Sequence, residues 1–580
     1  MSEIRKASEL RPWLKHFPEA FINMPTMCCT LEELIRTFNK KLDGPAIEYY
    51  GTTFSMNDMF AKADECAKAL AAAGVKCGDH LTVFMQFQPE FMFLLLAAEK
   101  IGAALVCRDG VDEDYVNALQ VAKGPLCFIQ DDFTKEQEQL FYDSCPELKH
   151  IVTFNPFTYA VKETMPDYIL ANIDKRYSET SIINNADERT MTWTQLIAGA
   201  EGFTGDYIAP RDPDRNLYHP FTSGSTGPSK EIMHCARTMT GILGQLCPMM
   251  TQIPFTMRCM MPTLPPALIA MVVPIVLLYT STGHTEILNP YMAIEDHDLE
   301  LMRYMPNGTV AVSNLGRALL DSKRIPADFQ FPQLMQIGGG AEASDNKLLK
   351  RFAAWLQQHG AKYAKFTMGF GQTEAGPVIA TAASFCEYND LKCGIPLPKN
   401  IVGIFDEDCN EIDYASVGEV CVCSPGVMKG YAKEEDTKKA LKVHADGRTW
   451  LHTGDMGFFN DEGELTVVSR GWDKTWMGGN LYLMVMENKI VELPGIDDCF
   501  FVAVPDAEHE GYKVPYLYLI PEEGAVLADI EAEMKDALEP YEYPVEIRII
   551  KERPWFHFKT YRIGLVREIL AEREAAKAAQ

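Results

Sequence analysis

The chain has 580 residues and carries a formal net charge of −27 at pH 7. Hydrophobic residues make up 47% of it and charged residues 23%, which is typical of globular domains and excludes disordered, collagen-like and fibrous classes. Its length predicts more than one domain and a large buried core. Because so acidic a surface repels nucleic-acid phosphates and anionic lipid, we expect neither as a partner.

The sixteen cysteines are scattered from Cys28 to Cys499, and no two of them form a Cys-x-x-Cys pair. This distribution favours buried, reduced thiols in a cytoplasmic protein. The twelve histidines are dispersed without the spacing of zinc ligands, so we expect no zinc site. The N-terminus lacks the apolar segment of a signal peptide, which also favours the cytoplasm.

A stretch without charged side chains, from Cys259 to Thr285, is long enough for a transmembrane helix. Several prolines interrupt it, among them Pro265, Pro266 and Pro274. A proline inside a helix removes a backbone hydrogen bond and clashes with the preceding turn. We therefore expect a loop followed by a core helix, and no membrane span.

Helical and strand-like patterns alternate along the first part of the chain. Helical periodicity covers residues 57–73 and 90–101, while short apolar runs at 81–87 and 104–107 are typical of buried strands. The alternation predicts an α/β fold with parallel strands and crossover helices. No period of roughly 20 to 50 residues repeats, which excludes solenoids and propellers.

The pattern changes after about Arg470. Beyond it, two strand-like runs, a helix, a third strand and a final helix follow one another closely. This series predicts a compact α+β unit of the size of a separate small domain. We therefore predict that residues 1–470 form a large N-terminal domain and residues 471–580 a small C-terminal one.

A donor-rich turn at residues 222–230 has the sequence TSGSTGPSK. Its glycines let the backbone turn tightly and present N–H groups to anionic oxygens, while hydroxyls and a lysine add further donors. A Walker A loop would place Gly before the lysine and Ser or Thr after it, but Ser229 and Glu231 stand there, which disfavours a P-loop NTPase. The predicted triphosphate-binding residues are Thr222, Ser223, Gly224, Ser225, Thr226, Gly227 and Lys230.

This turn resembles the phosphate loop of the adenylate-forming superfamily, which includes acyl-CoA synthetases, peptide-synthetase adenylation domains and luciferases. Further motifs of that superfamily follow in the same order over nearly the whole chain, and such a series is less easily matched by chance than one loop. The resemblance implies a large N-terminal adenylation domain of layered β-sheets and helices, with a small mobile α+β domain after it. The motifs stand at residues 338–344, 368–374, 453–455, 469–473 and 558–562.

The first two of these motifs resemble the family's adenine-binding segment and its aromatic-Gly-x-Thr-Glu motif. The resemblance implies that Phe370 packs against adenine, that Thr373 contacts the α-phosphate and that Glu374 holds Mg²⁺. A hard cation that bridges phosphates prefers carboxylate oxygen, which agrees with that role for Glu374. The implied adenine contacts are Gly339, Gly340, Ala341, Phe370 and Gly371.

The next two motifs resemble those that bind ribose and form the hinge between the domains. A carboxylate can accept hydrogen bonds from both ribose hydroxyls, and the resemblance gives this role to Asp455. It implies that Arg470 contacts ribose or phosphate and that Trp472 and Asp473 lie at the hinge, where the small domain rotates between half-reactions. The bulky Trp472 departs from the family pattern and brings the usual hinge behaviour into question.

The last motif, Phe558-Lys-Thr-Tyr-Arg562, is similar to the segment that carries the family's catalytic lysine. The resemblance implies that Lys559 bridges the substrate carboxylate and the α-phosphate and stabilises the charge of the pentacoordinate transition state. Phe558 stands where the family has glycine. Gly478 and Gly479 match a glycine turn that approaches the pantetheine tunnel of coenzyme A.

The acyl pocket is expected around the loop at Pro265, with Gly338 and His234 as further contacts. The segment 264–268 contains no carboxylate that could pair with the ammonium group of an amino acid, and a buried unpaired charge is costly. The sequence therefore favours a substrate that is not an amino acid and has an apolar aliphatic or aromatic body. Asn314 is a further candidate for a polar contact.

These features predict an AMP-forming acid–thiol ligase, which activates a carboxylic acid with ATP, releases pyrophosphate and transfers the acyl group to coenzyme A. ATP, Mg²⁺ and coenzyme A are the expected cofactors, and a monomer or homodimer is expected. An acyl carrier protein is the alternative acceptor. A catalytically degenerate nucleotide- or acyl-binding protein is the second alternative, because Ser469, Trp472 and Phe558 all depart from the family pattern.

Overall fold

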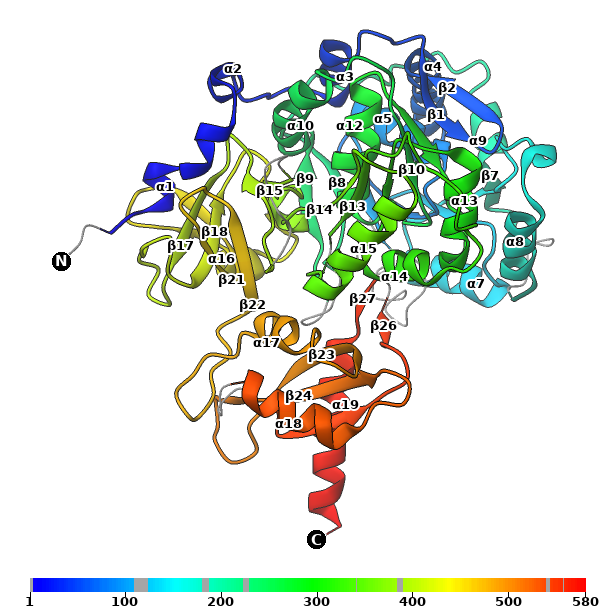
Figure 1. Ribbon diagram of the computed structural model, residues 1–580. Helices are drawn as coiled ribbons and strands as arrows, with labels where there is room; N and C mark the ends of the chain where they lie inside the picture. The colour runs from blue at the N-terminus through cyan, green and yellow to red at the C-terminus, as the bar shows by residue number, and fades with distance from the viewer. Residues whose placement is uncertain are drawn as a thin grey trace.

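The computed structural model describes residues 4–108, 124–179, 187–222, 229–340, 342–382, 390–538, 543–556 and 558–579. Figure 1 shows a large unit above and a small unit below, joined just after strand β22, which ends at Arg470. The predicted α/β fold with a large N-terminal and a small C-terminal part is confirmed.

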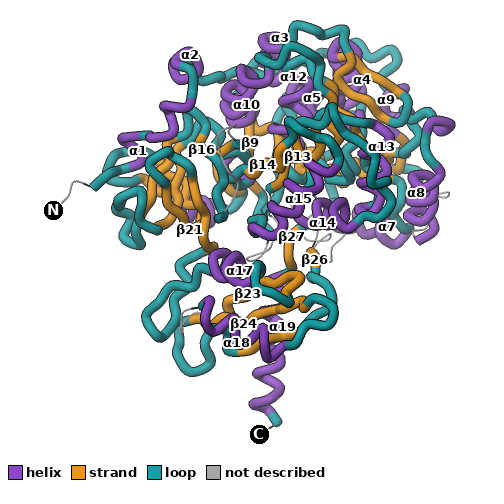
Figure 2. The backbone as a smooth tube through the Cα atoms, viewed as in Figure 1, coloured by secondary structure: helices purple, strands orange, loops and turns teal. Residues whose placement is uncertain are grey.

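Two mainly parallel sheets form the interior of the large unit, and Figure 2 shows helices around their strands. The first sheet has the order β14(Lys365–Met368), β13(Gln336–Gly339), β12(Gly308–Val310), β10(Arg258–Met261), β11(Thr285–Leu288), β1(Pro45–Tyr49), β2(Thr52–Ser55). The second has the order β19(Gly430–Tyr431), β9(Ile232–Cys235), β8(Asn216–His219), β4(Ala104–Cys107), β3(His80–Phe84), β5(Leu126–Gln130), β6(His150–Phe154), β7(Thr190–Thr192). Only the edges β1–β2 and β8–β9–β19 pair antiparallel within the described residues.

A third, antiparallel sheet completes the large unit and carries two of the predicted site residues at its end. Its strands are β17(Ile401–Phe405), β18(Gly418–Cys423), β21(Thr449–Phe459), β20(Leu441–Val443) and β22(Leu465–Arg470). A separate antiparallel pair, β15(Ala380–Thr381) and β16(Ile395–Pro396), precedes the third sheet in the sequence. Antiparallel pairing of β21 with β22 places Asp455 directly opposite Arg470.

The helices of the large unit follow the predicted crossover pattern. Residues 57–73 and 90–101 were predicted as helices and correspond to α4 and α5, while β3 and β4 occupy the predicted strands. The helices are α1(Ala7–Leu10), α2(Glu19–Asn23), α3(Leu31–Phe38), α4(Met56–Ala72), α5(Pro89–Ile101), α7(Lys135–Ser144), α8(Asp167–Glu179), α9(Trp193–Ala198), α10(Ala236–Met250), α11(Ile269–Met271), α12(Leu278–Ser281), α13(His297–Tyr304), α14(Ser313–Asp321), α15(Asn346–Gln358) and α16(Glu434–Ala440). Shorter turns are η1(Pro12–His16), η2(Lys162–Thr164), η3(Val272–Leu277), η4(Ile294–Asp296) and η5(Thr373–Ala375).

The main hydrophobic core forms around α5. Nearly every residue of this helix is buried, on all of its faces, because it packs against α4 and against strands β4 and β8. A helix that is apolar all round is typical of a position inside a large core. Helix α5 is therefore an interior helix of the large unit.

The apolar stretch from Cys259 to Thr285 forms the predicted loop and core helix, preceded by a strand that was not predicted. Strand β10 contains its first residues, and the helix comprises α11, the π-helical turn η3 and α12. Pro274 lies in η3, where widening of the helix accommodates its missing N–H group. In the described part of the chain, no helix is long and apolar enough to cross a membrane.

The small unit has a three-stranded sheet with a helical layer. Its strands are β23(Ile496–Pro505), β24(Lys513–Pro521) and β25(Glu546–Ile549), and its helices are α17(Leu483–Ile490), α18(Leu527–Ala537) and α19(Arg562–Ala578). A further two-residue pair, β26(Trp555–Phe556) and β27(Lys559–Thr560), extends toward the large unit in Figure 1. The small unit has hydrophobic clusters of its own, as expected of a separate α+β domain.

The N-terminal segment packs against the third sheet, more than 400 residues away in the sequence. Trp13 is fully buried and stacks on Phe459, with 5.3 Å between ring centroids. A Cβ atom on Gly463 would lie 2.4 Å from the Trp13 nitrogen, so the backbone approach requires glycine there. Arg5 binds Asp413 and Asp461, each at 3.0 Å.

Replacing Trp13 with alanine is expected to lower the free energy of unfolding by about 3–5 kcal/mol, because it removes a large side chain from a closed site. Urea denaturation followed by far-UV circular dichroism measures the change. The matched control is Trp476→Ala, since Trp476 is 55% exposed. Equal midpoints for the two variants would contradict the packing role.

Candidate active site

The ammonium group of Lys559 lies between the two units. Strand pair β26–β27 carries Lys559 from the small unit to the end of the third sheet, where Asp455, Glu374 and Glu342 act on its charge. Burial and the neighbouring Arg470 guanidinium lower the pKa of Lys559, while these carboxylates oppose that change. The sequence motifs at Asp455, Glu374, Arg470 and Lys559 therefore converge on one place.

Phe558, which stands where the family has glycine, makes a contact between the two units. Its side chain packs against the main hydrophobic core of the large unit, although the residue belongs to the small unit. It therefore anchors the segment next to Lys559 by apolar contact, a task that the family's glycine at this place cannot perform.

Asp455 is buried in the middle of strand β21 and held from two sides. Gln372 donates from Nε2 to the Asp455 carboxylate (2.5 Å) and to the Thr453 carbonyl (2.7 Å). The Arg470 Nε lies 3.9 Å from the other carboxylate oxygen. Burial raises the pKa of Asp455, and the nearby Arg470, Gln372 and Lys559 counteract the rise. The carboxylate is thus fixed in position beside Arg470.

A chain of contacts links the phosphate loop to Glu374. Thr222 and Lys230 pair at the base of the loop, with a 2.9 Å hydrogen bond from the Lys230 N–H to the Thr222 hydroxyl. The Lys230 ammonium lies 5.1 Å from the centre of the Tyr431 ring, and the Tyr431 hydroxyl donates to Glu374 Oε1 at 2.7 Å. Asp436 lies 3.8 Å from the same ammonium. The loop residues Ser223, Gly224, Ser225, Thr226 and Gly227 lie outside the described residues, as does Ala341.

His234 supports the backbone at Thr373. It is fully buried, and its Nε2 lies 2.8 Å from the Thr373 carbonyl while its Nδ1 lies 3.0 Å from the Thr238 hydroxyl. Because the carbonyl can only accept, the Nε2 position must carry the proton. Both ring nitrogens are therefore engaged, and burial lowers the pKa of His234 to about 4. This geometry makes His234 a positioning residue for Thr373, and its predicted contact with the acid stays a prediction.

Glu342 joins the units beside Lys559. Its carboxylate accepts from the Thr560 N–H (3.3 Å) and lies 3.4 Å from the Arg562 guanidinium, which also binds Glu487 at 2.5 Å. Arg317 of the large unit lies 3.2 Å from Asp498 of the small unit. These ion pairs hold the small unit in the orientation that places Lys559 in the site.

The glycines of the adenine motifs are required at two positions. A Cβ atom on Gly371 would lie 1.6 Å from the Pro377 carbonyl oxygen, and one on Gly339 would lie 2.4 Å from the Phe366 ring. Gly338 and Gly340 have no neighbour closer than 3.8 Å to such a Cβ atom. Phe370 pairs with Ala380 through backbone hydrogen bonds and is partly buried. Close backbone packing therefore shapes the predicted adenine segment.

The turn after β22 contains a left-handed glycine that the sequence motif did not single out. Gly471 has φ +81° and donates its N–H to the Gly454 carbonyl at 2.7 Å. The next residue, Trp472, has no such conformation, and the Asp473 carboxylate binds Lys513 of the small unit at 2.6 Å. The backbone freedom at the junction therefore resides in Gly471.

The residues predicted for the acyl pocket and for the coenzyme A tunnel lie in different places. Pro265 is buried in a loop whose neighbours Leu264 and Ile269 belong to the main core. Gly478 and Gly479 form the tip of a turn at the surface, where the adjoining Trp476 stacks on His509 at 4.3 Å. Within the turn, the Gly479 N–H donates to the Thr475 hydroxyl at 3.2 Å, and Lys474 at its base binds Glu407 of the large unit. Asn314 is buried at the start of α14.

The donor set around Glu374 fits Mg²⁺. One carboxylate oxygen is engaged by Tyr431, and no hydrogen bond engages the other among the described residues. Mg²⁺ takes one or two protein carboxylates together with phosphate oxygens and water, and such an ion would neutralise charge on a bound triphosphate. The carboxylate of Glu374 would hold it, as the sequence predicts.

The small unit places its Lys559 beside acidic and hydrogen-bonding groups of the large unit. This arrangement defines a two-domain nucleotide-dependent enzyme. The model of the AMP-binding enzyme family matches residues 34–432, and that of the AMP-binding enzyme C-terminal domain matches residues 485–555. The chain belongs to the AMP-binding enzyme family. The predicted membership of the adenylate-forming superfamily, and the predicted class of AMP-forming acid–thiol ligase, are confirmed at the level of that family.

Curated relatives match the chain over different lengths. A long-chain-fatty-acid–CoA ligase of Salmonella typhimurium is 23% identical over 558 residues, covering 93% of this chain and 95% of that protein. A 4-coumarate–CoA ligase of Solanum tuberosum is 31% identical over 179 residues, which cover 30% of this chain and 32% of that protein. The chain is thus similar to ligases whose named acids differ widely.

Solved structures share the fold over nearly the full length. The anthranilate CoA ligase AuaEII, in complex with anthranoyl-AMP, has a TM-score of 0.75 at 17% identity and covers 96% of this chain and 99% of its own. ATP-bound MatB from Rhodopseudomonas palustris has a TM-score of 0.71 at 19% identity, covering 94% of this chain and 99% of its own. At these identities the likeness establishes the fold alone.

The buried His234 is expected to make stability depend on pH. Because its pKa is about 4 when folded and 6.5 in the unfolded chain, the unfolded state binds an additional proton between these values. The free energy of unfolding therefore falls as pH falls, by about 3 kcal/mol from this group. Urea denaturation at pH values from 7 to 4 should show that the free energy of unfolding of His234→Gln falls less with pH than that of the wild type. The control His509→Gln, whose side chain is 30% exposed, should retain it; parallel curves for His234→Gln and wild type would contradict the assignment.

Proposed function

We propose that this chain activates a carboxylic acid with ATP, forming an acyl-AMP and pyrophosphate, and then transfers the acyl group to the thiol of coenzyme A. The observation that carries the proposal is the place of Lys559, held beside Asp455, Glu374 and Arg470 by the small unit. A carboxylate that attacks the α-phosphate of ATP adds negative charge there, and a preorganised ammonium group in an enclosed site stabilises it.

We propose the following division of tasks around the nucleotide. The turn at residues 222–230 binds the β- and γ-phosphates, and its Lys230 is held over Tyr431. Asp455 accepts from the ribose hydroxyls, and Arg470 binds ribose or phosphate from the opposite strand. Thr373 contacts the α-phosphate, with its carbonyl fixed by His234. Gly339, Gly340, Ala341, Phe370 and Gly371 enclose adenine, and Glu374 holds Mg²⁺.

We propose an acid with an apolar body as the substrate. The segment 264–268 is mostly buried and lies beside the main core, and it contains no carboxylate to pair with an amino-acid ammonium. An amino group buried without a partner would be costly, so an aliphatic or aromatic acid is favoured. The named acids of the relatives, long-chain fatty acids and 4-coumarate, belong to this chemical class.

Transfer to a thiol requires that Lys559 leave the site, and we propose that the small domain, residues 471–580, turns about Gly471 and its neighbours Trp472 and Asp473. The turn at Gly478–Gly479 would then approach the site with the pantetheine arm. The ion pairs of Glu342 and Arg317 with the small unit must break during this motion. An acyl carrier protein remains the alternative acceptor, and a nucleotide- or acyl-binding protein without turnover remains the alternative to an enzyme.

The decisive measurement is carboxylate-dependent exchange of pyrophosphate into ATP, over a panel of short, long, aromatic, dicarboxylic and amino acids. Exchange with an apolar acid, followed by formation of its coenzyme A thioester, is expected. Nucleotide binding without exchange for any acid would select the binding protein. Exchange without thioester formation, restored by an added acyl carrier protein, would select the other acceptor.

Lys559→Ala is expected to reduce the exchange rate by about 100-fold or more, because it removes a preorganised charge from the reacting phosphate. Thioester formation from preformed acyl-AMP should change little, since the lysine must leave the site before that step. The matched control is Lys551→Ala, an exposed lysine of the small unit. An equal loss in both half-reactions would point to a structural defect and not to a role in adenylation.

Gly471→Ala is expected to disturb the orientation of the small domain. An alanine in the left-handed conformation costs about 1–2 kcal/mol. This corresponds to a roughly five- to thirtyfold lower population of any domain orientation that needs φ +81° at this residue. The exchange rate should therefore fall relative to thioester formation from preformed acyl-AMP. Gly524→Ala, at φ +83° in open space on the small unit, carries the same backbone cost and should leave that ratio unchanged.

A further inference from the structure

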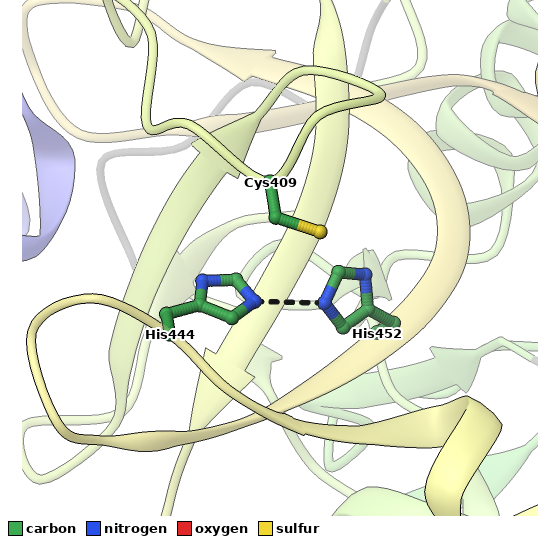
Figure 3. Close-up of side chains that lie close together, drawn as sticks. All are labelled: Cys409, His444 and His452. Atoms are coloured by element: carbon green, nitrogen blue, oxygen red, sulfur yellow. Dashed lines mark hydrogen bonds between the residues drawn. The ribbon is translucent and has the colours of Figure 1, made fainter.

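Three potential metal ligands meet on the third sheet, next to the bulge at Gly454 that precedes Asp455 in strand β21. Cys409 lies in the turn between β17 and β18, His444 in the turn before β21, and His452 on β21 itself. Figure 3 shows their side chains facing one another, with the two Nε2 atoms 2.9 Å apart. One ligand atom of each residue lies within 4.8 Å of the other two.

The tautomer of His452 follows from its neighbour Glu419. The His452 Nδ1 lies 2.8 Å from the Glu419 carboxylate, which can only accept when ionised, so the ring proton resides on Nδ1. The lone pair is therefore on Nε2 and is directed at His444. A histidine whose other nitrogen donates to a carboxylate is the arrangement that orients metal ligands in proteins. The His452 side chain is only 6% exposed, so the orientation is fixed by packing.

His444 is positioned by aromatic packing. Its ring contacts Phe405 edge-on at 4.7 Å and stacks on Trp450 at 5.9 Å. Its Nδ1 is buried and has no hydrogen-bond partner within the residues the structure describes. The ring orientation thus comes from Phe405 and Trp450, and it aims Nε2 at His452.

We propose that Cys409, His444 and His452 bind one zinc ion, with Sγ and the two Nε2 atoms as protein ligands. Thiolate and imidazole together are the ligands of Zn²⁺, whereas Mg²⁺ and Ca²⁺ require oxygen. Tetrahedral zinc with bonds of about 2.0 Å to nitrogen needs about 3.3 Å between two nitrogens, so the rings separate by a few tenths of an ångström on binding. The fourth position is left for water or another small ligand.

A neighbouring trio, Glu419, Cys421 and His452, does not compete as a site. Cys421 is fully buried, and its Sγ lies 3.5 Å from His452 Nδ1, the nitrogen already engaged by Glu419. Cys409, by contrast, is partly exposed, so a cation can enter from solvent on that side. Lys442 lies 3.9 Å from its sulfur and can balance the charge of a thiolate ligand.

The zinc site is connected to the nucleotide site by one carboxylate. Glu419 Oε2 holds His452, and its Oε1 accepts from the Gly454 N–H at 3.0 Å, directly before Asp455. Bound metal would therefore fix the bulge of strand β21 that precedes the ribose-binding carboxylate. We expect zinc to lower the KM for ATP, a consequence that rests on the proposed function, whereas zinc binding itself does not.

The test uses the full chain, stripped with a chelator and kept reduced, and titrated with Co²⁺ as a spectroscopic substitute and then with Zn²⁺. One equivalent of Co²⁺ should give an intense tetrahedral visible spectrum with a thiolate charge-transfer band, and Zn²⁺ should displace it. Cys409→Ser should remove the band and weaken binding at least tenfold, as should His444→Gln. Glu419→Gln, which removes the charge behind His452, should weaken it about 10- to 100-fold.

Cys77→Ser is the matched control, since Cys77 is an exposed thiol far from the cluster in sequence, and it should bind as wild type does. Far-UV circular dichroism of the metal-free variants checks that each is folded. Absence of the cobalt spectrum, or its survival in both Cys409→Ser and His444→Gln, would overturn the proposal. If cobalt binds as described while no acid supports pyrophosphate exchange, the metal site stands and the proposed function fails.

Discussion

The ammonium group of Lys559 sets the main constraint on this structure, because a buried lysine needs compensating charges from both units. Asp455, Glu374 and Glu342 supply negative charge from the large unit, and Arg470 lies among them to limit the attraction. The small unit must dock to bring the lysine there, and Glu342 serves that docking as well, through Thr560 and Arg562. Glu342 therefore contributes both to the charge compensation of Lys559 and to the orientation of the small unit.

The departures from the family pattern become intelligible in this light. Phe558 replaces a flexible glycine with a side chain that packs on the large unit, so apolar contact adds to the ion pairs around Glu342. Trp472 stands beside the junction, but the left-handed backbone conformation belongs to Gly471. To leave this orientation, the small unit must break several contacts with the large unit at once. This favours a switch between two discrete domain orientations over a gradual change.

The sequence predicts the fold and the individual motifs well, since helical and strand periodicity and the ordered motifs are local properties. It names Asp455, Arg470 and Lys559 as candidates, but only strand register and domain docking bring them together. Tyr431 and Glu342 escaped prediction for the same reason: each acts through a partner distant in the chain. The dispersed spacing of the histidines did not predict that His444, His452 and Cys409 meet, because these residues converge only when β17, β18, β20 and β21 pair.

The packing of Trp13 against Phe459 also determines when the chain can finish folding. Arg5 binds Asp461 across 456 positions of sequence, and Gly463 closes over Trp13. During synthesis from the N-terminus, these first residues have no partner until the strands of the third sheet have been made. The indole of Trp13 therefore stays exposed to solvent while the strands before residue 400 are synthesised. The N-terminal segment can close onto the third sheet only after Phe459 and Gly463 have been made, which gives a chaperone time to act on it.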